Sequence, residues 1–397
     1  MRIAILTSGI LPVPAVQGGA VENLIDFYLE YNDQHHLHDI TVYSVWHPDV
    51  CRHPALQANC NHYHYIDMSS LWTKVKRRVY GLIHRHEYYN FYIEYFFERA
   101  WQHIRRQHYD IIVLENRPGY AWKLSRRGFN NLVLHLHNDL LNNTTPHHQQ
   151  IFSSLCRIIT VSDYIKDRVA TIAQSDKVMT IYNGIDLMQF QRHETSIITR
   201  TSIGFSDSDF VLVYSGRLNH NKGISELIDA MLLLKNQPQI KLLVIGSTFF
   251  ADASGENTFV RSLKEKAMPI QERLTFTGFI PYQQMPKYLQ LADVGVIPSL
   301  WPEPFGLTVI EAQAMGLPTI ASRQGGIPEI ISEENAVIVP TDHDYATQLA
   351  NAILHLYQSP RQQRADMAVK ARQNASQYSR ERYAHDFLKA LETTSLK

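Results

Sequence analysis

The sequence has few cysteines, no excess of charge of either sign and no long apolar run. Its 397 residues include three cysteines, Cys51, Cys60 and Cys156. This odd set has no metal-ligand spacing, which argues against a disulfide framework and predicts a reducing, cytoplasmic compartment. Lys plus Arg and Asp plus Glu both number 38, which argues against a globally basic nucleic-acid-binding protein and against an acidic disordered tail. No stretch approaches the roughly 18 apolar residues of a membrane span.

Short apolar runs alternate with longer amphipathic runs, which indicates βαβ units and parallel sheets. In the first half the strand candidates are 2–7, 39–45, 62–66, 110–115, 131–137, 157–161 and 178–182. In the second half they are 210–215, 241–245, 274–278, 294–298, 319–321 and 337–339. Together with the chain length, this pattern predicts an α/β protein of two doubly wound, Rossmann-like domains facing a cleft.

A change of composition marks the expected domain boundary. Asn-Gly, a polar run and Ser-Asp-Ser follow one another within 183–208, and such clusters are typical of linkers. We therefore expect an N-terminal domain over 1–186, a C-terminal domain over 187–375 and a final helical segment over 376–397.

The loop after the first strand lacks the G-x-G-x-x-G pattern of dinucleotide-binding proteins. It is longer and carries Gly18 and Gly19, followed by a helix expected from Ala20. Adjacent glycines let a ligand approach the backbone closely, and a helix N-terminus favours an anion. The alternative is an ordinary turn.

Two cations follow the first strand of the second half, in the sequence VLVYSGRLNHNKGISELI. Arg217 supplies a fork of donors and Lys222 a point charge, a combination that suits a diphosphate. They would neutralise a leaving diphosphate without a metal. The alternative is a pair of solvated surface charges.

Two carboxylates flank a helix start in PSLWPEPFGLTVIEAQAMG. Glu303 lies between two prolines and Glu311 about one turn into the helix. The N–H groups of Gly306, Leu307 and Thr308 would point at an anion placed there. The carboxylates would accept hydrogen bonds from sugar hydroxyls. For Glu311, the alternative is a first-turn acid that stabilises the helix dipole.

These three motifs together resemble family-4 retaining nucleotide-sugar glycosyltransferases of the type-B fold (GT-B). Further matches are ITVSDYIKDRV, IYNGID, FTGFIPYQQMPKYLQLADVGVIPS and GGIPEII, so the resemblance covers nearly the whole chain. HLHND and GSTFFADASGEN resemble transferases that add N-acetylglucosamine or a related hexose to lipopolysaccharide cores.

The resemblance implies a role for each matched residue. The implied catalytic set is His137 beside the donor sugar, Glu303 on that sugar, and Arg217 with Lys222 on the diphosphate. The implied donor-binding set is Gly18, Gly19, Gly246, Phe279, Ile280, Gly306, Leu307, Thr308 and Glu311, the last on the ribose hydroxyls. It further implies that the first domain faces the acceptor, that the second binds the nucleotide sugar, and that the final helix packs back on the first.

Two residues at strand ends in the first half have competing interpretations. His137 closes a strand whose same face carries His135, but with 20 histidines in the chain a structural histidine is the alternative. Glu115 and Asn116 end the preceding strand, where family members carry acceptor-side residues. A helix-cap cluster before Pro118 is the alternative for this pair.

Segment 74–127 is locally basic, with twelve Lys or Arg against five Asp or Glu and many interleaved aromatics. One interpretation is a helix packed on the sheet with a solvated basic face. The other is an acceptor-side surface that docks on anionic lipid, which would place the protein peripherally at the inner face of the plasma membrane. Nucleic-acid binding is not expected, because no recognition motif accompanies the charge.

The resemblance implies transfer of a hexose, such as N-acetylglucosamine or glucose, from a nucleotide sugar to a hydroxyl of a glycan. UDP is the favoured nucleotide, and a lipopolysaccharide core or a capsule or exopolysaccharide precursor, free or lipid-linked, is the expected acceptor. Retention by front-face displacement without metal or cofactor is expected. The alternatives are a sugar-nucleotide epimerase or phosphorylase on the same fold, and a non-catalytic scaffold of a glycan-assembly complex.

Overall fold

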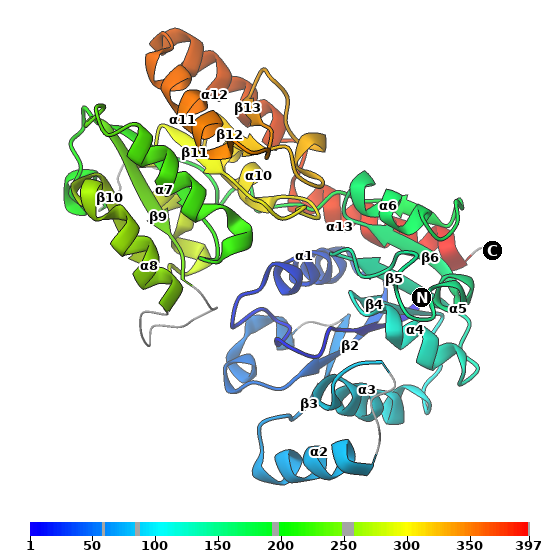
Figure 1. The fold of residues 1–397 in the computed structure, drawn as a ribbon. Coiled ribbons are helices and arrows are strands. Elements are labelled where there is room, and N and C mark those ends of the chain that lie inside the picture. Colours follow the sequence, from blue (N-terminus) through cyan, green and yellow to red (C-terminus); the bar gives the residue numbers. More distant parts are fainter. Residues whose placement is uncertain (58–59, 84–87, 193–197, 248–257, 396–397) are drawn as a thin grey trace. The chain divides into compact units, whose positions relative to one another are not determined.

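The computed structural model describes the chain except for residues 58–59, 84–87, 193–197, 248–257 and 396–397 (Figure 1). The chain forms two compact units. Unit 1 comprises Met1–Gly184 together with Arg380–Lys397, and unit 2 comprises Ile185–Ser379. Residues 185–186 and 376–379 thus belong to unit 2, although the expected boundaries placed the first two in the N-terminal domain and the last four with the final helix.

Unit 1 is built on a seven-stranded sheet of order β3-β2-β1-β4-β5-β6-β7, in which every pairing is parallel. The strands are β1 (Arg2–Leu6), β2 (Asp39–Val45), β3 (Asn61–Ile66), β4 (Ile111–Glu115), β5 (Leu132–Leu136), β6 (Leu155–Thr160) and β7 (Val178–Thr180). Its helices are α1 (Ala20–His35), α2 (Leu71–Ile83), α3 (Phe91–Ile104), α4 (Pro118–Ser125), α5 (His148–Ser154), α6 (Asp163–Ala170) and α13 (Arg380–Ser395). The strand order reverses between β1 and β4, and ligands of such sheets bind at the carboxyl ends of the strands beside that point.

Unit 2 contains a six-stranded parallel sheet of order β10-β9-β8-β11-β12-β13. Its strands are β8 (Phe210–Ser215), β9 (Ile240–Ile245), β10 (Leu274–Gly278), β11 (Val294–Ile297), β12 (Thr319–Ser322) and β13 (Ala336–Val339). Its helices are α7 (Ile224–Leu233), α8 (Thr258–Ala267), α9 (Met285–Leu289), α10 (Leu307–Ala314), α11 (Tyr345–Gln358) and α12 (Arg361–Ala375). Here the order reverses between β8 and β11. The two doubly wound parallel sheets confirm the predicted fold class, and every strand lies within two residues of its expected bounds.

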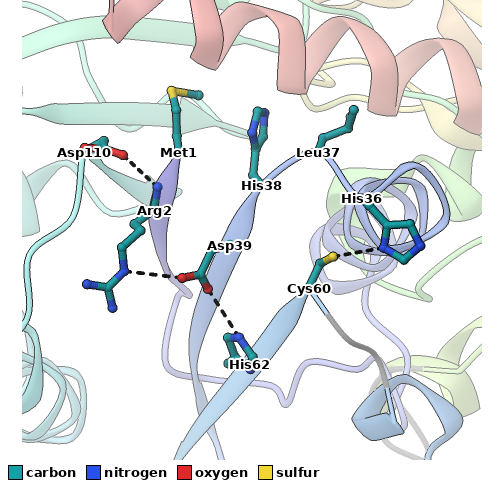
Figure 2. Close-up of a pocket in the computed structure, with 9 residues that line it drawn as sticks. All are labelled: Met1, Arg2, His36, Leu37, His38, Asp39, Cys60, His62 and Asp110. Carbon is teal, nitrogen blue, oxygen red and sulfur yellow. Dashed lines mark hydrogen bonds and ion pairs between the residues drawn. The ribbon is translucent and has the colours of Figure 1, made fainter.

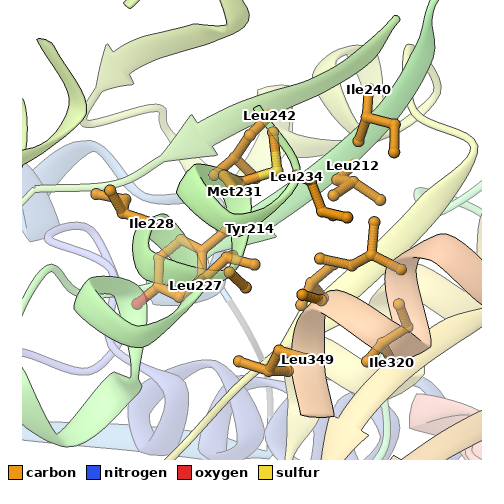
Figure 3. Packing of buried hydrophobic residues seen from close by; sticks show 14 of the residues in the cluster. Leu212, Tyr214, Leu227, Ile228, Met231, Leu234, Ile240, Leu242, Ile320 and Leu349 are labelled. Atoms are coloured by element: carbon orange, nitrogen blue, oxygen red, sulfur yellow. The ribbon is translucent and has the colours of Figure 1, made fainter. Parts of the chain in front are cut away.

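The core of unit 2 fixes α7 against the sheet. Leu212 of β8 and Leu242 of β9 are fully buried, as are Leu227 and Met231 of α7 (Figure 3). Burying one such side chain contributes about 1.5–3 kcal/mol. The loop between β8 and α7 is therefore anchored at both ends, which holds Lys222 at the carboxyl edge of the sheet.

The final helix, α13, packs on α1 within unit 1. The rings of Tyr28 and Phe387 stack with their centroids 4.4 Å apart, and both side chains are fully buried. Phe387 shares one buried hydrophobic cluster with Val113 of β4 and Val133 of β5. Among the described helices, none is both long enough and apolar enough to cross a bilayer.

Candidate functional site

An ion pair joins the loops that follow β8 and β11 in unit 2. Nζ of Lys222 lies 2.5 Å from Oε1 of Glu303, and the hydroxyl of Ser299 donates to the same oxygen at 2.7 Å. The main chain of this loop is also held, because the Gly326 N–H donates to the Glu303 carbonyl at 2.7 Å. The structure thus brings the residue expected on the diphosphate into contact with the residue expected on the sugar. A bound phosphate would compete with Glu303 for the ammonium group.

Arg217 is exposed at the carboxyl end of β8. Its carbonyl accepts a 2.8 Å hydrogen bond from the hydroxyl of the buried Tyr214, which fixes the backbone of the loop. The guanidinium is therefore carried by an anchored main chain at the edge of the sheet where ligands of this fold bind.

The N-terminus of α10 lies three residues after Glu303. Gly306 is the N-cap residue, and no side chain caps the helix. The first N–H groups of a helix have no acceptor within the helix, so Leu307 and Thr308 present donors at the positive end of the dipole. This helix start and the nearby Lys222 form an anion-binding arrangement on neighbouring loops.

Glu311 lies one turn into α10 and is only 6% exposed. Burial raises the pKa of this carboxyl to about 7, although its hydrogen bond with Tyr282 favours the ionised form. Tyr282 begins the short η6 turn (Tyr282–Gln284) and was not identified from the sequence. Glu311 lies beyond the first turn of α10, which contains no acidic residue, so it does not fit the alternative of a first-turn acid that stabilises the helix dipole.

The expected nucleotide pocket lies at the ends of β9 and β10. Gly246 has a φ of 144°, and a Cβ there would lie 1.9 Å from the carbonyl oxygen of Gly216, so only glycine fits this close approach. Its N–H donates to the Gly278 carbonyl at 3.0 Å. Phe279 is exposed and Ile280 half-buried just beyond. Most of the GSTFFADASGEN segment, residues 248–257, lies outside the described residues.

In unit 1, the buried carboxylate of Glu115, at the end of β4, contacts polar side chains from β5 and α1. Oε2 of Glu115 lies 2.9 Å from Nε2 of His137 and 3.1 Å from Nδ1 of His135. The hydroxyl of Tyr28, on α1, donates to Oε1 of Glu115 at 2.9 Å. No side chain caps α4, so the helix-cap interpretation of Glu115 is wrong: its partners come from α1 and β5.

These contacts set the charge of the cluster. Burial by itself would raise the pKa of Glu115, but the charge of His135 and the hydrogen bonds from both histidines outweigh it and hold this pKa well below its usual range. Burial and the neighbouring His135 lower the pKa of His137. A neutral His137 that donates from Nε2 to a carboxylate keeps its lone pair on Nδ1, and Nδ1 has no hydrogen-bond partner in the described structure.

A second acid stands near this cluster. Glu22, in the first turn of α1, is 5% exposed, and burial raises its pKa to about 7 while His137 lowers it and Glu115 raises it. A Cβ on Gly19, where φ is 114°, would lie 2.2 Å from Oε2 of Glu22. Gly19 therefore lets Glu22 fold back against the loop. Gly18 also has a positive φ, of 75°, and open space around it.

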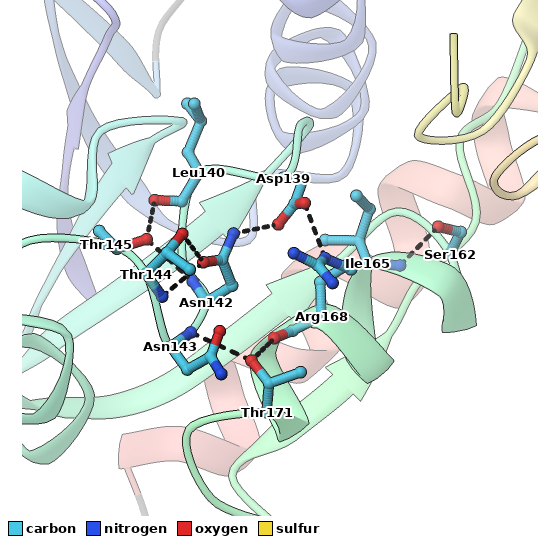
Figure 4. Close-up of polar contacts among 10 residues, drawn as sticks. All are labelled: Asp139, Leu140, Asn142, Asn143, Thr144, Thr145, Ser162, Ile165, Arg168 and Thr171. Carbon is cyan, nitrogen blue, oxygen red and sulfur yellow. Dashed lines mark hydrogen bonds and ion pairs between the residues drawn. The ribbon is translucent and has the colours of Figure 1, made fainter. Parts of the chain in front are cut away.

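Asn116 and the loop after β5 position the main chain around His137. The Asn116 side chain accepts a 3.2 Å hydrogen bond from the His137 N–H, and Asn116 itself has a φ of 58°. Beyond His137, Asp139 accepts from Asn142 at 2.8 Å and from Arg168 of α6 at 2.7 Å (Figure 4). The loop is thus held to α6, which fixes the strand end that carries His137.

Glu115, His135 and His137 also form the one group of potential metal ligands among the described residues, with ligand atoms within 4.8 Å of one another. Two imidazoles and a carboxylate suit several divalent transition metals. One nitrogen of each histidine contacts Glu115 directly, and metal-independence stays an expectation.

The basic segment 74–127 is not one surface. Residues 74–83 lie on α2, while the rest of the segment outside residues 84–87 runs through α3, β4 and α4. Phe96, Phe97 and Tyr120 are fully buried, and they belong to the core. Among its described residues, a docking face can therefore involve only part of the segment.

A hollow of about 420 Å³ opens at the opposite, amino edge of the unit 1 sheet (Figure 2). Its polar groups pair with one another: Asp39 lies 3.3 Å from both Arg2 and His62, and the Arg2 N–H donates to Asp110 at 2.7 Å. Since ligands of these sheets bind at carboxyl ends, we do not assign this hollow to the site.

Comparison with known proteins gives two family matches along the chain. Residues 33–189 match the model of Glycosyltransferase Family 4, and residues 197–381 match that of Glycosyl transferases group 1. Spore coat protein SA of Bacillus subtilis is 26% identical over 99% of both chains. The lipopolysaccharide 1,2-N-acetylglucosaminetransferase of Salmonella typhimurium is 25% identical over 54% of each. The solved structure of Anabaena Alr3699/HepE in complex with UDP and glucose has the same fold, with a TM-score of 0.73 and 22% identity over 99% of this chain and 100% of that one.

Proposed function

This chain belongs to the family 4 glycosyltransferases, and we propose that it transfers a hexosyl group from UDP-hexose, with retention of configuration, to a glycan hydroxyl. The observation that carries this proposal is the Lys222–Glu303 pair, 2.5 Å apart, beside the uncapped N-terminus of α10. One loop cluster thus offers a cation and helix N–H groups for phosphate and a carboxylate for sugar hydroxyls.

Donor binding rearranges this ion pair. The diphosphate takes the Lys222 ammonium, Arg217 and the N–H groups of Leu307 and Thr308, all of which favour negative charge. Glu303 is then released to accept hydrogen bonds from the sugar. Glu311 binds the ribose hydroxyls, and the backbone at Gly246, Phe279 and Ile280 surrounds the base. The choice of UDP is supported by the fold relative solved with UDP and with UDP-glucose.

Transfer breaks the bond between the anomeric carbon and the diphosphate oxygen, and the acceptor oxygen bonds to that carbon on the same face. The acceptor proton passes to the leaving diphosphate. Lys222 and Arg217 stabilise the charge that develops on this leaving group, which is the part of the barrier that preorganised cations lower most. His137 completes the proposed catalytic set, in the neutral state that burial and the neighbouring His135 favour, and no metal takes part.

We propose N-acetylglucosamine or glucose as the sugar and a lipopolysaccharide core or a capsule or exopolysaccharide precursor as the acceptor. The lipopolysaccharide N-acetylglucosaminyltransferase relative, 25% identical over 54% of each chain, supports N-acetylglucosamine as the sugar and a lipopolysaccharide core as the acceptor. Three free cysteines fit a reducing compartment. We therefore place the reaction in the cytoplasm at the inner face of the plasma membrane, with Glu115 and Asn116 on the acceptor side.

The first test is thermal unfolding of the purified protein with UDP, GDP or ADP and with their sugars. A ligand at about 100 times its Kd adds roughly 2.7 kcal/mol of stability. We expect stabilisation by uridine nucleotides that is lost in Lys222→Met. If no nucleotide stabilises the wild-type chain, the donor site is wrong and the scaffold alternative gains support.

A second test follows UDP release and product stereochemistry by NMR. UDP release that requires an acceptor and gives a retained anomeric configuration supports the transferase. Conversion of the UDP-sugar without any acceptor would instead identify an epimerase. Equal turnover in EDTA and in added Mg²⁺ would support metal-independence, whereas loss in EDTA would contradict it.

A further inference from the structure

Helix α2 carries an exposed apolar stripe. Of the 17 large hydrophobic side chains exposed among the described residues, six lie on this 13-residue helix. They are Leu71, Trp72, Val75, Val79, Leu82 and Ile83, exposed by 79%, 78%, 53%, 46%, 86% and 70%. At about 100° per residue, these positions fall within an arc of about 120° on one side of the helix. Such a concentration differs from the scattered apolar residues of ordinary surfaces, and contiguous apolar patches mark interaction sites.

The opposite side of α2 holds the helix on unit 1. The Arg77 guanidinium lies over the rings of Phe91 and Tyr92 of α3, at 5.6 and 4.9 Å from their centroids. Tyr80 meets Tyr95 edge to face at 6.0 Å. Figure 1 shows α2 on the outer side of α3. Because α2 packs on α3 through its other side, its apolar stripe faces away from α3 and is not used for packing within unit 1.

The charges around the stripe identify its partner. Lys74 and Arg78 lie along one edge of the arc and Lys76 along the other, all three exposed, and α2 contains no acidic residue. An apolar face flanked by lysine and arginine, with a tryptophan on it, is the composition of helices that lie in the plane of a membrane. The flanking cations would contact anionic headgroups while the apolar side chains enter the acyl boundary.

We propose that α2 docks the protein on an anionic phospholipid bilayer, with Leu71, Trp72 and Leu82 inserted and Lys74, Lys76 and Arg78 on the headgroups. This goes beyond the proposed reaction, since docking needs neither donor nor acceptor. It also replaces the broad segment 74–127 by one helix face, and it gives the proposed membrane location a physical basis.

The test is co-sedimentation with vesicles of phosphatidylcholine alone and of phosphatidylcholine with phosphatidylglycerol, in low and high salt. We expect binding to the anionic vesicles only, weakened by salt. The double variant Leu71→Glu, Leu82→Glu should bind at least about tenfold more weakly. Replacing Lys74, Lys76 and Arg78 by Gln should cost about fivefold per charge.

Matched controls come from unit 2. Leu233 and Met268 are exposed by 58% and 64%, so Leu233→Glu with Met268→Glu makes the same chemical change away from α2. Lys235→Gln with Arg361→Gln removes two exposed positive charges from unit 2, for comparison with the expected effect per charge on α2. Both control pairs should bind vesicles like the wild type. Trp72 fluorescence should shift to the blue on anionic vesicles, and Trp72→Phe should abolish that shift.

Two results would overturn the proposal. One is wild-type protein that stays in the supernatant with anionic vesicles; the other is a stripe variant that binds them as the wild type does. A wild-type dimer that the stripe variant converts to a monomer, without vesicle binding, would assign the stripe to contact between copies. Stabilisation by UDP, measured on the same variants, reports separately on the donor site.

Discussion

Nε2 of His137 lies 2.9 Å from Oε2 of Glu115, inside unit 1, and both side chains are almost completely buried. Tyr28 and His135 complete the shell of this carboxylate. Removing one partner of a buried, hydrogen-bonded charge leaves the others unsatisfied. Glu115 therefore positions His137 and fixes which ring nitrogen carries the proton.

Glu115→Gln should destabilise unit 1 by about 3–5 kcal/mol and lower turnover more than donor binding. The amide has one oxygen where the carboxylate has two, so its NH₂ group would face either the hydroxyl that Tyr28 donates or the N–H groups of the two histidines. Chemical denaturation measures the loss of stability. UDP release measures turnover, and UDP-stabilised melting measures donor binding. Glu30→Gln, in the surface pair of Glu30 with Arg380, is the control and should cost about 0–1 kcal/mol.

Acid should destabilise unit 1 through the same cluster. The pKa of Glu115 is depressed in the folded state, so its contribution is present above the unfolded value of about 4.3 and is lost as pH falls through and below it. The pKa of His137 is also lowered, so stability falls as pH drops below about 6.5. Unfolding free energies between pH 3 and 8 would show both steps, and Glu115→Gln should lack the lower one. A wild-type profile without an acid limb would contradict this assignment.

Glu303→Gln and Lys222→Met should separate the two halves of their ion pair. Glu303→Gln leaves the ammonium of Lys222 without its carboxylate, so UDP should bind as well as in the wild type or more tightly while sugar transfer is lost. Lys222→Met should lose both UDP binding and sugar transfer. Calorimetric titration with UDP and with UDP-glucose measures this contrast. Equal loss of UDP affinity in the two variants would show that the pair acts only as a structural clamp.

Glu311→Gln should remove a pH dependence from unit 2. The folded pKa of Glu311 is raised to about 7, so the folded state binds an extra proton and stability falls as pH rises from about 4.5 to 7. A shift of this size corresponds to at most about 3 kcal/mol. Glu334→Gln, at an exposed pair with Lys370, should keep the wild-type slope. Identical slopes in the two variants would mean that Glu311 has the same pKa in the folded and unfolded states.

Gly246→Ala should destabilise unit 2 more than Gly278→Ala. Both glycines have a positive φ, but only at Gly246 does a Cβ meet a backbone atom, the Gly216 oxygen at 1.9 Å, whereas Gly278 has open space. The Gly278 variant should lose only the conformational cost of about 1 kcal/mol for a positive φ. In the Gly246 variant, the new Cβ should in addition push the loop after β9 away from the Gly216 carbonyl in the loop after β8. Thermal unfolding of the two variants side by side gives the difference, and equal melting temperatures would remove the steric argument.

Much of the fold could be predicted because strand formation leaves a local signal. Continuous apolar runs such as 242–245 mark strands buried on both faces, and short apolar segments located all thirteen strands of the described residues. The family motifs around Gly18, Arg217 and Glu303 are also local, since each spans one strand end and one helix start. They identified the glycosyltransferase family, which the comparisons confirm.

Other features depended on which strands become neighbours. Tyr28 and Glu115 are 87 residues apart, and Lys222 and Glu303 are 81 apart, so no periodicity links either pair. Glu22 and Tyr28 were missed because an acid or tyrosine on an amphipathic helix looks the same whether it covers the core or a site. His135 was noted only as sharing a strand face with His137, and no periodicity marks Tyr282, which lies in a short turn. The basic segment 74–127 could not be divided into buried and exposed parts from the sequence either, because charge and aromatic content do not reveal burial. Local pattern decides where strands and helices form, whereas sheet order and packing decide which polar side chains meet out of water, and burial there sets their charge.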